Sequence, residues 1–119
     1  MKNFKQLKVW QQGKQIAIEV YKLSEKLDRQ GSFTFSSQIT RAAVSISSNI
    51  AEGSSRRSEK EYYRYLEIAL GSSFELETQL EIMKELEVSE ASEAAKIIEL
   101  INEEQRMLHG LMNNLDTKN

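Results

Sequence analysis

The chain has 0 Pro and only 5 Gly in 119 residues, so few positions can interrupt a helix. Its apolar residues recur at three- and four-residue steps, and no stretch sustains the apolar–polar alternation that is typical of strands. Gly31 and Gly53 fall where the helical pattern lapses, as glycines at helix ends do. The sequence therefore predicts long amphipathic helices and no sheet.

Four helical segments follow from this pattern. We expect them at Phe4 to Leu27, at Phe35 to Gly53, directly after Ser58, and from about Ser89 onward. Ser58 and Glu61 have the spacing of a capping box, in which the hydroxyl and the carboxylate each accept a hydrogen bond from a backbone N–H. The third helix therefore has a defined start.

Four helices of similar length joined by short connections pack best as antiparallel neighbours. The predicted fold is all-α, an antiparallel up-down-up-down four-helix bundle that forms a single domain over residues 1–119. The longest run without a charge, Gln30 to Thr40, is far shorter than the ~20 residues of a membrane span. No apolar stretch of a signal peptide follows the first lysines, so we expect a cytoplasmic protein without membrane contact.

The composition excludes several kinds of catalytic site. With 0 Cys, neither a disulfide nor a thiolate zinc site can form, and the single His rules out a multi-histidine metal centre. That residue, His109, is near the end of the chain, and the serines cluster in small-residue stretches that are typical of close helix packing. There is no glycine-rich phosphate loop. We expect no catalytic residue, no metal, no cofactor and no enzymatic activity.

The third predicted helix carries more apolar residues than one core face requires. Tyr63, Leu70 and Phe74 lie about 80–120° round the helix from Tyr62, which belongs to the inner seam. This flank has two interpretations: a wide core stripe covered by neighbouring helices, or an oligomer interface. Its length favours the interface, and hence a homo-oligomer.

Charge is divided unevenly along the chain, although the formal net charge is only -2. Residues 1–66 hold twelve Lys or Arg and six Asp or Glu, whereas residues 67–119 hold four and twelve. In an up-down-up-down bundle, the chain start and the connection between the second and third helices share one end. That end is predicted to collect Lys2, Lys5, Lys8, Arg56, Arg57, Lys60 and Arg64.

Cations beside the free N–H groups of a helix N-terminus suit a phosphate, so this basic end is a candidate nucleic-acid-binding site. Tyr63 and Tyr65 nearby could stack on bases. The alternative is a set of solvated side chains in local ion pairs, each of which contributes little. A pI of about 5.5 argues against strong non-specific duplex binding by a monomer, but a ring of basic ends would concentrate the cationic charge.

The stretch from Gln38 to Leu80 resembles the four-helix-bundle protein family encoded in 23S rRNA intervening sequences of some bacteria. Its most specific parts are Ser45 to Gly53 and Ala69 to Leu80, and the first and fourth helices fit the same pattern. The resemblance implies a bundle commonly assembled as a homopentamer, with no enzymatic activity established for the family. The chain is also similar to accessory proteins of diversity-generating retroelements, which are basic pentamers that bind nucleic acid and a reverse transcriptase.

The resemblance also marks Asn49, Glu52 and Gly53 as motif positions with a structural role. Asn49 faces inward and needs buried hydrogen-bond partners, while Gly53 suits a left-handed helix stop. The chain departs from the family pattern at three places: Ser47 stands where Pro is usual, Asp28 lies near another usual Pro position, and Thr40 replaces a frequent basic residue.

Two functions fit this sequence. The first is a homo-oligomeric, non-enzymatic bundle that binds the backbone of structured RNA or DNA through its basic end. The alternative is a protein–protein scaffold that binds a basic partner through the apolar flank or through the acidic fourth helix. The carboxylates of that helix are Glu90, Glu93, Glu99, Glu103 and Glu104.

Overall fold

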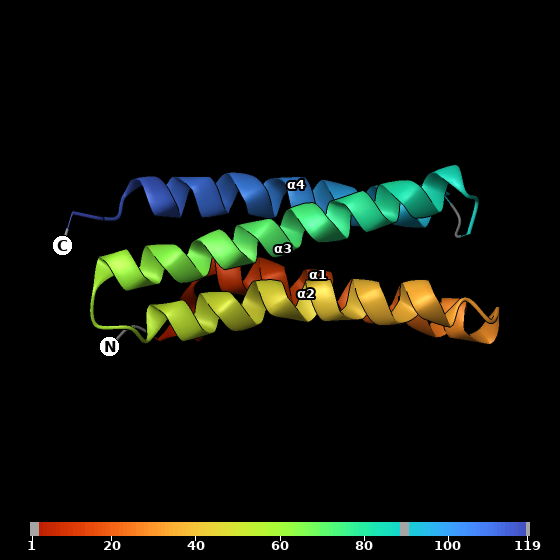
Figure 1. Cartoon of the computed structure of the whole chain (residues 1–119), viewed down its shortest axis with the longest axis horizontal. Coiled ribbons are helices and arrows are strands. Elements are labelled where there is room, and N and C mark those ends of the chain that lie inside the picture. The colour runs from red at the N-terminus through yellow and green to blue at the C-terminus, as the bar shows by residue number, and fades with distance from the viewer. Residues whose placement is uncertain (1–2, 89–90, 119) are drawn as a thin grey trace.

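The computed structural model describes residues 3–88 and 91–118, and these residues are all-α. A short 3₁₀ helix, η1 (Phe4–Gln6), precedes four long helices: α1 (Lys8–Arg29), α2 (Phe33–Ser54), α3 (Glu59–Glu85) and α4 (Ala91–Asn113). They form a rod of 48 × 20 × 20 Å (Figure 1). Four long helices, with no strand in the described residues, agree with the predicted all-α bundle.

Each long helix packs against two others, since α1 and α3 both contact α2 and α4. Within the described residues no Cα atom of α1 lies within 8 Å of a Cα atom of α3, so these two helices are diagonal in the bundle. In Figure 1, α1 and α3 run away from the end that holds both termini, and α2 and α4 return toward it. Contacts between α1 and α4 also show that these two helices run in opposite directions. Gln12 donates to the Leu100 carbonyl, whereas Lys26, later in α1, reaches Glu93, earlier in α4.

The first helix begins later than its apolar pattern predicts. Leu7 is extended, with ψ 126°, and separates η1 from α1, so the long helix starts at Lys8 rather than at Phe4. The Asn3 side chain accepts a hydrogen bond from the Lys5 N–H and caps η1. The chain start is therefore a separate helical turn at the end of the bundle where α1 begins.

The turn between α1 and α2 follows the prediction. Gly31 has φ 83°, in the left-handed region that glycine adopts without strain. α2 begins at Phe33 rather than Phe35 and ends at Ser54. The predicted start of the fourth helix, at Ser89, lies outside the described residues.

Gly53 corrects a prediction, because it is not a left-handed helix stop. It is buried inside α2, and among the described glycines only Gly31 has a positive φ. A Cβ on Gly53 would lie 2.6 Å from the Cβ of Tyr65 and 3.3 Å from the carbonyl oxygen of Tyr62. Glycine is required here because the end of α2 lies against the first turns of α3.

The core residues follow the three- and four-residue spacing of the apolar pattern, although Tyr21, which belongs to the same pattern in the first helix, is 58% exposed. Each aliphatic side chain taken out of water stabilises the fold by roughly 1.5–3 kcal/mol. The following apolar residues have no exposed surface: Ile16, Ile39, Ile46, Ile50, Leu66, Leu76, Leu80, Ile101 and Leu108.

The start of α3 forms half of the predicted capping box. The Ser58 hydroxyl oxygen accepts from the Glu61 N–H at 3.1 Å, as predicted. The Glu61 carboxylate accepts from the Ser58 hydroxyl at 3.3 Å, and not from a backbone N–H. This cap fixes where α3 begins and thereby places the cations that precede and follow it.

Candidate nucleic-acid interface

The cations of the chain start and those of the α2–α3 connection lie at one end of the rod. η1 contacts both α1 and α2, and Figure 1 shows the chain start beside the connection between α2 and α3. We name this cluster the basic pole. Lys2 lies outside the described residues, and the pole comprises Lys5, Lys8, Arg56, Arg57, Lys60 and Arg64.

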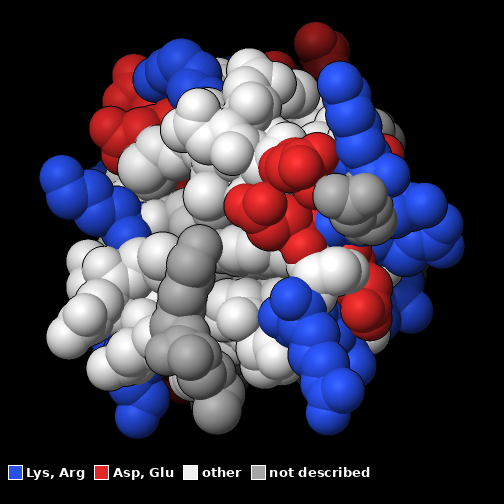
Figure 2. All heavy atoms as spheres, turned by 90° about the vertical axis from the view of Figure 1, so that its left-hand side faces the viewer, with Lys and Arg blue, Asp and Glu red and all other residues white. Residues whose placement is uncertain are grey.

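Seen end-on, the pole is a rim rather than one continuous patch. Figure 2 shows Lys and Arg side chains spread round the edge of this end, with acidic side chains among them. Glu59 and Glu61 lie in the first turn of α3, where negative charge interacts favourably with the dipole of the helix N-terminus. A single phosphate therefore meets separated cations, whereas an extended polyanion can contact several of them.

Arg56 is the pole residue with the most local contacts. Its guanidinium lies 3.3 Å from a Glu52 carboxylate oxygen and donates to the Tyr65 hydroxyl at 2.8 Å. It also stacks 4.8 Å from the centroid of the Tyr65 ring. For Arg56 the local ion-pair interpretation therefore applies. Because Arg56 covers one face of the Tyr65 ring, a nucleic-acid base cannot stack on that face.

The other described cations of the pole are exposed and stand apart from acidic partners. No ion pair within residues 3–88 and 91–118 engages them. Lys60 and Arg64 are one helical turn apart on α3, so they share a face. The exposed cations are Lys5, Lys8, Arg57, Lys60 and Arg64.

The small polar residues of the motif join α2 to α3. Asn49 is half-buried, and its side-chain amide donates to the Ser45 carbonyl at 2.8 Å and to the Ser45 hydroxyl at 3.0 Å. The Ser45 and Ser72 hydroxyls are 2.8 Å apart across the two helices. Gly53 allows the close approach of the same two helices, and Glu52 pairs with Arg56 in the connection between them.

The predicted oligomer flank divides into two parts. Tyr63 and Leu70 are half-buried and pack against the core of their own chain, as the wide-stripe interpretation requires. Phe74 is 48% exposed, and Ile68 and Ile82 on the outer side of α3 are exposed as well. This outer part of the flank leaves the larger apolar surface for another molecule, and the interface role of Tyr63, Leu70 and Phe74 stays a prediction.

Glu104 corrects the predicted acidic surface of the fourth helix. It is fully buried in the core, while Glu99 and Glu103 are exposed and Glu90 lies outside the described residues. Burial, with a smaller contribution from Glu103, raises the pKa of the Glu104 carboxyl to about 8. The sequence does contain a sign of this burial. Glu104 comes three residues after the core residue Ile101, and residues three apart on a helix lie on the same face.

The described residues hold neither a cluster of metal-ligand side chains nor a helix that could span a membrane. No group of three His, Asp or Glu side chains gathers there as metal ligands would. None of the helices in residues 3–88 and 91–118 combines the length and apolarity needed to cross a membrane. The fold and the site define an all-α helical bundle with exposed cations gathered at one end.

Comparison with known proteins gives the family. A family model described as 23S rRNA-intervening sequence protein matches residues 5–110, and the chain belongs to that family. Among solved structures, it is similar to a protein of unknown function from the S23 ribosomal protein family of Bacteroides thetaiotaomicron. The two share 26% sequence identity and a TM-score of 0.85, over 89% of this chain and 99% of the other. A comparison with curated proteins finds no match.

Proposed function

We propose that this protein is a non-enzymatic, homo-oligomeric bundle that binds the phosphate backbone of structured RNA or DNA through its basic pole. One observation carries the proposal. Exposed cations from η1, the start of α1, the α2–α3 connection and the start of α3 gather at one end of the rod, and within the described residues only Arg56 among them has an ion pair.

The charge of the rest of the molecule supports binding at the pole alone. With a formal net charge of -2, the chain as a whole repels a polyanion. A single pole offers few phosphate contacts, so one copy binds weakly and in a salt-sensitive way. Self-association that brings several poles onto one nucleic acid increases the affinity without any new kind of contact. The family resemblance to pentamers supports this arrangement.

RNA is the nucleic acid to test first, because the matching family is described by reference to 23S rRNA. The experiment is fluorescence anisotropy with a structured RNA over a series of salt concentrations. R57A/K60A removes two exposed pole cations, and we expect about 10-fold weaker binding. The slope of log affinity against log salt should fall in size by ~2.

A matched variant tests whether position matters. R29A/K96A also removes two exposed cations, but they lie at the C-terminal end of α1 and early in α4. We expect this variant to keep the wild-type salt slope. Equal losses in both variants, or no measurable binding by the wild type at low salt, would contradict the proposal.

The scaffold alternative is favoured at one place. On the outer side of α3, exposed Ile82 and Leu86 lie beside Glu81 and Glu85, a combination that suits a basic protein surface. Binding of a basic protein that survives nuclease treatment would support this function over the first.

A further inference from the structure

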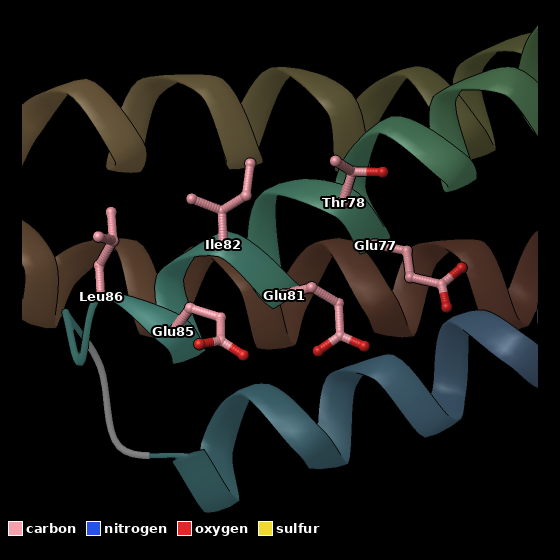
Figure 3. A pocket seen from close by; sticks show the side chains of 6 residues that line it. All are labelled: Glu77, Thr78, Glu81, Ile82, Glu85 and Leu86. Atoms are coloured by element: carbon pink, nitrogen blue, oxygen red, sulfur yellow. The ribbon is translucent and has the colours of Figure 1, made fainter.

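The C-terminal part of α3 carries an exposed strip that mixes apolar and acidic side chains (Figure 3). Ile82 is 46% exposed and Leu86 61% exposed, and they border a hollow of ≈ 440 Å³. Contiguous apolar exposure of this kind is typical of an interaction site. We define the acidic strip by the residues that line the hollow: Glu77, Thr78, Glu81, Ile82, Glu85 and Leu86.

The acidic strip is ordered in two rows along α3. One row is Thr78, Ile82 and Leu86, and the other is Glu77, Glu81 and Glu85. Successive residues of a row are four apart in the sequence, which is about 6 Å along the helix axis. Side chains along one face of any other helix repeat at the same distance, so the rows can match them. Figure 3 shows the rows side by side, with the carboxylates on the side of α4. The strip therefore fits a helix that presents both apolar residues and cations.

α1 carries an exposed strip of the opposite charge. Ile18 is 40% exposed and Tyr21 58% exposed, and they border a hollow of ≈ 460 Å³ together with Lys14 and Lys22. Glu25 is the one acidic residue at this hollow. We define the basic strip as Lys14, Ile18, Tyr21 and Lys22.

The charges of both strips have weak partners within their own chain. Lys22 lies 3.7 Å from Glu19 and Glu81 lies 3.3 Å from Lys84, each three residues away on the same helix. Such pairs between exposed side chains stabilise a helix only slightly. Glu85 has no ion pair in the described part of the chain. An intermolecular contact can therefore use these charges at little cost.

We propose that the acidic strip of one copy docks on the basic strip of a second copy. The two strips are exposed on α1 and α3, which are diagonal in the bundle, so they do not meet within one chain. Docking would cover Ile82 and Leu86 with Ile18 and Tyr21, and would set Glu81 and Glu85 near Lys14 and Lys22. A second copy is the occupant because it carries the complementary apolar and cationic surface already.

The contact is heterologous, since it joins two different surfaces. Each docked copy leaves one strip free, so the contact continues from copy to copy until a ring closes or a filament grows. This inference rests on the self-association in the proposed function and names the faces that make it. It does not depend on whether the pole binds nucleic acid.

Charge reversal tests the pairing. We expect nuclease-treated wild type to have the light-scattering mass of an oligomer, and E81K/E85K and K14E/K22E each to have the mass of a monomer. Mixed in equal amounts, the two variants should assemble again into species larger than a monomer, because the reversed strip of each variant carries the charge opposite to its docking partner on the other variant. The four-substitution chain should assemble alone for the same reason. E99K and K96E, which reverse exposed charges on α4, should leave the mass unchanged.

The outcomes separate this inference from the proposed function. A monomeric wild type would overturn the self-association in both. An oligomeric wild type whose mass survives both double reversals would overturn the strip pairing alone. Circular dichroism of each variant shows whether the bundle remains folded, and recovery of assembly in the mixture demonstrates folding independently. A mixture of folded variants that stays monomeric would also overturn the pairing.

Discussion

Glu104 lies in the core with neither carboxyl oxygen hydrogen-bonded in the described part of the chain. A charged carboxylate in that place would be strongly unfavourable, so the carboxyl is neutral at pH 7, consistent with its pKa of about 8. Room for it comes from α1, because a Cβ on Gly13 would lie 3.0 Å from the Glu104 Oε2 atom. The residue couples the packing of α4 on α1 to proton binding.

Stability should therefore fall as the pH rises. Glu104 has a pKa of about 8 in the folded chain and 4.5 as its ordinary value, so between these values folding takes up a proton. The free energy of unfolding then decreases with pH across this window, by at most about 1.4 kcal/mol per unit. Urea unfolding of wild type and E104Q at pH 5, 7 and 9 measures the decline, which we expect E104Q to lack.

The neighbouring carboxyl provides the control for this experiment. Glu103 is exposed and is the smaller cause of the raised pKa of Glu104. E103Q should keep most of the decline in stability, because the larger cause, burial of Glu104, is unchanged. A wild type as stable at pH 9 as at pH 5 would contradict this account of Glu104.

At the scale of the helices, the residues that were predicted correctly are those governed by periodicity. Ile39, Leu66 and Ile101 are fully buried, in agreement with the three- and four-residue spacing of the apolar residues. The errors arise where a distant contact decides. Gly53 has the sequence context of a helix end, but the reason for glycine is Tyr65 on the next helix. Glu104 follows the apolar spacing, yet its charge indicates a surface position when the sequence is considered alone.

The close approach of α2 to α3 at Gly53 gives a direct prediction. In G53A the new methyl group meets the Tyr65 Cβ, which a side-chain rotation cannot move away. We expect a loss of about 1–3 kcal/mol in the free energy of unfolding. G71A is the matched control, because nothing lies within 4 Å of its added Cβ and alanine favours the helix. Urea denaturation should show G71A as stable as wild type or more so, and equal effects of the two substitutions would contradict the packing argument.

At the scale of the whole molecule, charge is divided both along the rod and around it. The uneven charge of the two halves of the sequence anticipates a cationic end, and the structure adds where each cation stands. The acidic and basic strips could not be predicted in the same way. Ile18 and Tyr21 are of residue types that are common in cores, and only the packed bundle shows that they are exposed.

The net charge of the chain and the local charge of the acidic strip lead to opposite predictions for the RNA affinity of one variant, E81K/E85K. It makes the net charge of the chain more positive, which by general electrostatics strengthens binding to RNA. If assembly brings several basic poles onto one RNA, the loss of the strip contact instead weakens binding to a long structured RNA, by about 10-fold or more. Anisotropy with an RNA long enough for several copies, and with one that fits a single pole, separates the effects. We expect weaker binding of the long RNA only, and tighter binding of both would show that the poles act singly.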